Sequence, residues 1–199
     1  MELLAMPYLV QPDGYYSRED ARVAWLEHLE DVLGALAHIA SVDAFQAWIY
    51  TDPSGADRDA RDARWLALRA DFERGVDWSG LDRERKARWY RQLHIFELPF
   101  YYIEYGIAQL GALQVFRNAV RDPRDAVAKY KQFLSLGGTR SLPELYAAAG
   151  VKLVFDAETM AELVAFTEER IAALRAGADA PFQGVVPISA SHSASLSAS

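Results

Sequence analysis

The stretch FYYIEYGIAQLGALQVF, Phe100–Phe116, decides the fold, because as a helix it is apolar over almost its whole circumference. A helix of this kind is buried among other helices, so we expect it at the centre of the protein. It carries one glutamate and two glutamines, which favours a buried helix over a membrane span. Gly106 and Gly111 cost helix propensity, and they predict that another backbone or a ligand comes close to the helix there.

Helical periodicity continues on both sides of this stretch, with apolar residues at three- and four-residue steps. The expected helices cover residues 21–39, 58–72, 81–96, 100–116, 124–136, 142–149 and 157–175. A further apolar and aromatic pattern occupies residues 43–50. Capping residues precede several of these segments, at Ser17, Asp122, Ser141 and Asp156. No run predicts a strand, so we expect an all-α fold of about seven helices.

The chain has 199 residues, of which 51% are apolar, and this is enough for one globular body with a sizeable core. We expect a helical domain over residues 1–176 and a disordered tail over 177–199, because the tail is rich in Ala and Ser. The absence of cysteine excludes disulfides, iron–sulfur clusters and thiol nucleophiles. No signal-peptide pattern opens the chain, which predicts a cytoplasmic protein.

The charge balance is acidic, with 21 Lys and Arg against 28 Asp and Glu and a net charge of −7. This balance argues against nucleic acid and against an anionic membrane as partners. One basic segment, residues 83–91, lies beside Trp89 and Tyr90, but Asp82 and Glu84 dilute its charge. We interpret this segment as a solvated helix face.

Few residues of the chain are suited to hold a metal ion. The sequence contains four histidines and no His-Glu-x-x-His motif. His28 and His38 are ten residues apart on one expected helix, too far to share a metal. His94 and Glu97 form a single His-x-x-Glu pair, whereas carboxylate-bridged metal sites need a second copy of it. We therefore expect no metal site from these residues.

The aromatic start of the central stretch is the best candidate for a site. It places three phenols, Tyr101, Tyr102 and Tyr105, next to the carboxylate of Glu104. Helical spacing would put Tyr101 and Tyr105 on one face with Glu97. Phenol hydroxyls can donate to a substrate carbonyl or to a developing oxyanion, but they also occur in ordinary aromatic packing with internal hydrogen bonds. The residues alone leave both interpretations open.

The sequence HIFELPFYYIEYGIAQLGA, His94–Ala112, resembles the C-terminal part of the oligoendopeptidase F branch of the thimet-oligopeptidase family of zinc peptidases. Shorter stretches agree with that family in order, at residues 1–4, 43–50, 76–78, 130, 134–137 and 145–150. The resemblance covers roughly residues 1–175 and leaves out the tail.

This resemblance implies an almost wholly helical fold with a deep channel that admits short peptides, and zinc as the cofactor of the complete family. It implies that His94, Tyr101 and Tyr105 bind the substrate carbonyl or the transition state. Tyr102 and Glu97 would contact substrate. Glu2 would match a glutamate that neighbours the zinc ligands.

The departure from the family pattern is as informative as the match. The family takes two zinc ligands and its general base from a His-Glu-x-x-His helix, which this sequence lacks. We therefore expect that the chain alone binds no zinc and cleaves no peptide, as a truncated or split peptidase would. The alternatives are a non-catalytic helical module that binds peptides or a partner, and a functionless remnant. A separate zinc-bearing half, or self-association, would then complete the surface.

Overall fold

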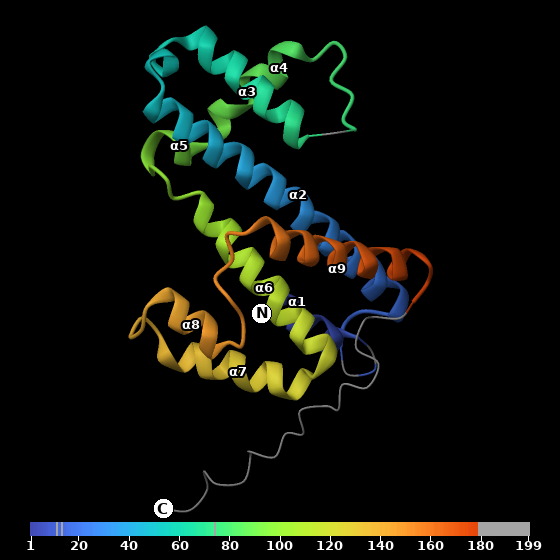
Figure 1. Ribbon diagram of the computed structural model, residues 1–199. Helices are drawn as coiled ribbons and strands as arrows, with labels where there is room; N and C mark the ends of the chain where they lie inside the picture. Colours follow the sequence, from blue (N-terminus) through green and yellow to red (C-terminus); the bar gives the residue numbers. More distant parts are fainter. Residues whose placement is uncertain (11, 13, 74, 179–199) are drawn as a thin grey trace, which may run out of the picture.

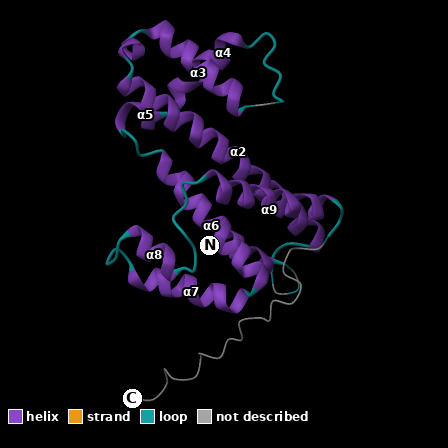
Figure 2. Ribbon diagram, viewed as in Figure 1, coloured by secondary structure: helices purple, strands orange, loops and turns teal. Residues whose placement is uncertain are grey.

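The computed structural model describes residues 1–178 except 11, 13 and 74, and within this part every regular element is a helix (Figure 2). The α-helices are α1 Glu2–Ala5, α2 Arg18–Thr51, α3 Arg58–Phe72, α4 Asp82–Ala87, α5 Leu93–Glu97, α6 Ile103–Arg121, α7 Pro123–Leu136, α8 Leu142–Ala148 and α9 Ala157–Arg175. Short 3-10 helices lie at η1 Met6–Leu9, η2 Pro53–Ala56 and η3 Arg88–Arg91. The expected all-α fold is confirmed. The tail from residue 179 lies outside the described residues.

Helix α2 is the longest helix of the described residues, and α3, α6 and α9 pack along it, whereas α7 and α8 lie on the far side of α6 (Figure 1). It begins at Ser17, whose side chain accepts a hydrogen bond from the backbone N–H of Asp20. It ends before Asp52 and Pro53. The two patterns at 21–39 and 43–50 form this one helix, because the residues that join them, Ala40, Ser41 and Val42, include no glycine or proline. By length and composition alone α2 could cross a membrane, and buried core helices pass the same test.

Two separate hydrophobic cores share α2. The first core contains Trp25, Leu29 and Val32 of α2, Leu110, Leu113 and Phe116 of α6, and Leu163, Ile171 and Leu174 of α9. The second core contains Val42 and Phe45 of α2, Trp65 and Leu68 of α3, Trp89 of η3 and Ile95 of α5. Because α2 belongs to both cores, it fixes α5 and α6 relative to each other.

Helix α6 is the central helix that the sequence predicts, and it also packs against α7 (Figure 1). The nearest atoms to its two glycines belong to side chains and not to another backbone. A Cβ at Gly111 would lie 2.9 Å from a ring carbon of Tyr146 of α8, and one at Gly106 would lie 3.3 Å from Cγ2 of Ile39. The Tyr146 hydroxyl donates to the backbone oxygen of Ile107 at 2.9 Å.

The structure divides the helix expected at residues 81–96 into α4, η3 and α5. Trp89 is the reason, because its ring is buried in the second core and its indole N–H donates to Asp62 at 2.9 Å. The expected basic face is also partly internal. Lys86 lies 3.4 Å from the Asp62 carboxylate, and Arg88 lies 2.7 Å from that of Glu73.

We predict opposite effects for alanine at the two glycines of α6. Gly111→Ala should lower the free energy of unfolding by about 1 to 3 kcal/mol, because Tyr146 must move and lose its bond to Ile107. Gly106→Ala should leave stability unchanged or raise it by up to about 1 kcal/mol, because Ile39 can yield and alanine favours the helix. Urea unfolding of both variants checks this, and equal effects would contradict it.

Candidate functional site

His94 and three tyrosines come together where α5 passes into α6. The Tyr105 hydroxyl lies 3.3 Å from Nε2 of His94. The Tyr101 ring lies parallel to the His94 ring at 6.0 Å, and the Tyr102 ring meets it edge-on at 4.9 Å. Tyr101 is 39% exposed and Tyr105 is 46% exposed, whereas Tyr102 is half-buried. The cluster is therefore reachable from solvent.

The prediction that Glu97, Tyr101 and Tyr105 share one face of a helix is wrong, because the three residues do not lie on one helix. Helix α5 ends at Glu97, and α6 begins only at Ile103. The intervening residues form a turn, in which Phe100 has a positive φ of 58°. The rings of Tyr101 and Tyr105 nevertheless meet edge-on at 5.6 Å, because the backbone already winds helically from Tyr101, where the N–H of Glu104 donates to the backbone oxygen of Tyr101.

Two of the phenols have a raised pKa. Coulombic interaction with the Tyr105 phenol and with Glu104 raises the pKa of Tyr101 above its usual value. Burial is the main cause that raises the pKa of Tyr102, and Tyr105 adds to it. Since an ordinary phenol is already protonated at neutral pH, both hydroxyls are hydrogen-bond donors there. Between Tyr105 and His94, the donor depends on the tautomer of the imidazole.

Gln46 of α2 holds the backbone that carries this cluster, a role that the sequence analysis did not predict. Its side chain is fully buried. Its amide nitrogen donates to the backbone oxygens of His94 and Leu98 at 3.1 and 3.3 Å, and its amide oxygen accepts from the backbone N–H of Phe100 at 2.9 Å. The available signal was a polar residue inside the apolar pattern at 43–50.

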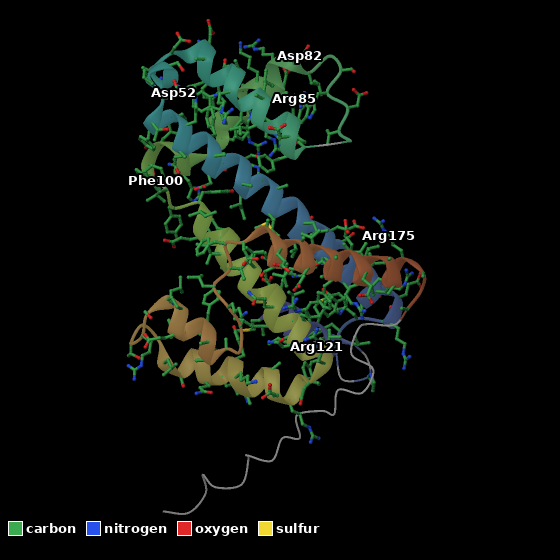
Figure 3. The ribbon with its side chains drawn as sticks, in the orientation of Figure 1. Asp52, Asp82, Arg85, Phe100, Arg121 and Arg175 are labelled. Atoms are coloured by element: carbon green, nitrogen blue, oxygen red, sulfur yellow. The ribbon has the colours of Figure 1, made fainter. Side chains whose placement is uncertain are left out.

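Phe100 lies in the connection between α5 and α6 (Figure 3), and its backbone there has a strained conformation. A bulky side chain at positive φ costs about 1 to 2 kcal/mol, and such strain persists only where the surroundings impose it. Here the bond from its N–H to Gln46 and the contact of its ring with Tyr50, at 5.3 Å, impose it. The turn is thus built to hold one geometry.

The two carboxylates among the candidates lie outside the cluster of rings. Glu97 is exposed at the end of α5. Glu2 of α1 is also exposed, with its carboxylate 3.8 Å from Nε2 of His28. Glu2 and His28 help to line a cavity of about 300 Å³, whose other walls come from α6, α7 and α8. This cavity contains none of the His94 cluster.

The described residues do not form a donor set suited to zinc. Structural and catalytic zinc sites take at least three protein ligands from Cys, His, Asp and Glu. Within residues 1–178, the masked positions aside, no three such side chains gather closely enough to hold a metal ion. The His94 cluster offers one imidazole and three phenols, which suits hydrogen bonding to a substrate oxygen.

The comparisons with known proteins agree with one another. The model of peptidase family M3 matches residues 1–164. The chain is 31% identical to a protein assigned as an oligoendopeptidase F, over 86% of this chain and 30% of that one, with a TM-score of 0.76. It is 28% identical to PZ peptidase A, solved with an inhibitor, over the same shares and with a TM-score of 0.77. The chain thus spans about a third of these structures. No curated protein matches it.

We predict that Gln46→Leu lowers the free energy of unfolding by about 2 to 4 kcal/mol, because it leaves three backbone groups of the turn without partners. Hydrogen exchange at the Phe100 amide should accelerate by more than the loss of global stability alone explains. Gln132→Leu on the exposed face of α7 is the control, and it should change neither quantity. Unaltered protection of the Phe100 amide in Gln46→Leu would contradict the role given to Gln46.

Proposed function

The chain belongs to peptidase family M3, and on that basis we propose that it forms the substrate-binding part of a peptidase that acts on short peptides. The observation that carries the proposal is the His94–Tyr105 pair, whose polar atoms lie 3.3 Å apart beside the exposed ring of Tyr101. Tyr101 and Tyr105 are the proposed contacts to the peptide carbonyl, with Tyr102 placed behind them.

The pair can direct one hydrogen toward a substrate. When Nε2 of His94 carries its proton, it donates to the Tyr105 oxygen, and the Tyr105 O–H is free to point outward. A chain of two such bonds polarises the outer O–H. Its natural acceptor is the carbonyl oxygen of a bound peptide, which gains negative charge when the peptide bond is attacked.

The family's zinc has no counterpart in the described donor set, so we derive no step through a metal. We propose that this chain binds peptides but does not cleave them alone. Cleavage would then depend on a His-Glu-x-x-His helix supplied by a further segment or by a separate polypeptide. Glu2 and the surrounding cavity lie at the N-terminal helix, where such a segment or polypeptide would pack.

An alternative is a non-catalytic helical module that binds peptides or a partner protein. Large apolar side chains around the cluster favour it, since they remain exposed in this chain. They are Leu93, Phe96, Leu98 and Phe100, each between 45% and 58% exposed. The acidic net charge supports a protein or peptide partner over nucleic acid. A cytoplasmic location remains a proposal.

We predict that short fluorescent peptides with apolar side chains bind the chain and that His94→Ala and Tyr105→Phe each weaken binding by at least about tenfold, or about 1.4 kcal/mol. Fluorescence anisotropy measures this. Tyr15→Phe, at a tyrosine that is 88% exposed outside the cluster, should bind as the unaltered chain does. Equal peptide affinity in all three variants would contradict the proposal that His94 and Tyr105 bind the peptide.

We also predict that these peptides stay intact in the presence of zinc salt, as followed by mass spectrometry. Hydrolysis that a chelator stops and that His94→Ala abolishes would show a complete peptidase and contradict the proposed inactivity. A further test separates the two proposed functions. The substrate-binding part of a peptidase should gain peptidase activity when a zinc-bearing polypeptide of the same family is added, whereas a non-catalytic module should not.

A further inference from the structure

A buried network of charged side chains lies beside the second core, apart from the His94 cluster. Its centre is Glu73 at the end of α3, which accepts hydrogen bonds from Arg69 at 2.6 Å and from Arg88 at 2.7 Å. The indole N–H of Trp78 donates to the same carboxylate at 3.2 Å. Arg69 is only 6% exposed, so its guanidinium depends on partners inside the protein.

His38 of α2 is one of these partners. Nη1 of Arg69 lies 3.3 Å from Nδ1 of His38 and 3.3 Å from Oγ of Ser41. A guanidinium has only donors, so Nδ1 of His38 must be the acceptor and its proton must reside on Nε2. Protonation of Nδ1 would leave Arg69 without this acceptor and would place two cations side by side.

The other side of His38 faces the segment that carries the cluster. Gln92, the residue immediately before α5, lies within reach of a hydrogen bond to the His38 imidazole. The His38 ring meets the Tyr102 ring edge-on at 5.9 Å, and Tyr102 in turn packs edge-on against His94. A continuous set of contacts therefore runs from the Glu73 network through His38 to His94.

We infer that His38 is a positioning residue for the His94 cluster, and that it acts only as a neutral imidazole anchored to Arg69. As the neutral tautomer it accepts from Arg69 and holds Gln92 and Tyr102, and so it fixes the start of α5 and the back of the cluster. The effect of His38 on peptide binding rests on the proposed function, whereas its effect on the geometry of the His94 cluster is independent of that function.

The charges that face His38 agree with a neutral ring. Burial is the main cause that lowers its pKa, and Arg69 and Arg88 lower it further, whereas the bond to Gln92 and the charge of Glu73 oppose the shift. The unfolded chain therefore takes up a proton at His38 before the folded protein does. The contribution of His38 to the free energy of unfolding is fully present above about pH 6.5, the pKa of an unperturbed histidine. It declines as the pH falls from there toward the lowered pKa of the folded protein.

Two variants separate positioning from general stability. In His38→Asn, the amide oxygen can accept from Arg69 and the side chain no longer titrates. In His38→Leu, the acceptor is lost. At neutral pH, NMR of the His94 and Tyr105 rings should show a clear shift in His38→Leu and a smaller shift in His38→Asn, which keeps the acceptor for Arg69 but lacks the ring that meets Tyr102. His28→Asn, elsewhere on α2 beside Glu2, is the control and should leave both rings unchanged.

Peptide binding across the pH range gives the second readout. Between neutral and mildly acidic pH, the unaltered chain should lose at least about fivefold more affinity than His38→Asn does, a difference of about 1 kcal/mol. His94 is present in both chains, so the difference isolates His38. Identical pH profiles, or unshifted His94 and Tyr105 rings in a folded His38→Leu, would overturn the inference. If the unaltered chain binds no peptide, the proposed function fails while the NMR test still decides the role of His38.

Discussion

Gln46 has no contact with solvent, so its amide must find its hydrogen-bond partners inside the protein. It finds them in the backbone of His94, Leu98 and Phe100, across the whole turn between α5 and α6. One side chain of α2 thus fixes the chain reversal from which the cluster of rings is built. Without these bonds, the buried amide and three backbone groups would all lack partners, and the strained φ of Phe100 would have nothing to maintain it.

The same principle extends to the neighbouring charges. Glu73, Arg69 and His38 are joined by hydrogen bonds that leave each group only one suitable protonation state. Their contact with the cluster runs through Tyr102, whose burial raises the pKa of its phenol. The exposed side of the site, at Tyr101 and Tyr105, is therefore backed by groups with little freedom. Such support is what a binding site needs to hold a carbonyl oxygen in one place.

The sequence was a good guide to helices and a poor guide to the breaks between them. Caps at Ser17 and Asp122 mark true helix starts, since a side-chain oxygen satisfies local N–H groups there without help from distant residues. The division of residues 81–96 was missed, because it depends on the burial of Trp89 against Asp62, far away in the chain. The turn at Phe100 was missed for the same reason, because the bond from Gln46 imposes it.

By itself, the sequence determined the all-α class and the central place of α6. Both follow from local periodicity, which needs no knowledge of distant contacts. The sequence also made His94 and three tyrosines candidates for a site, the histidine through the resemblance to a peptidase family. Only the tertiary structure decided which polar atoms meet. It paired Tyr105 with His94 across a turn, and it assigned Gln46 and His38 to the support of that pair. The reason is physical: a buried polar group is satisfied by whatever the packing brings to it, and packing is a property of the whole chain.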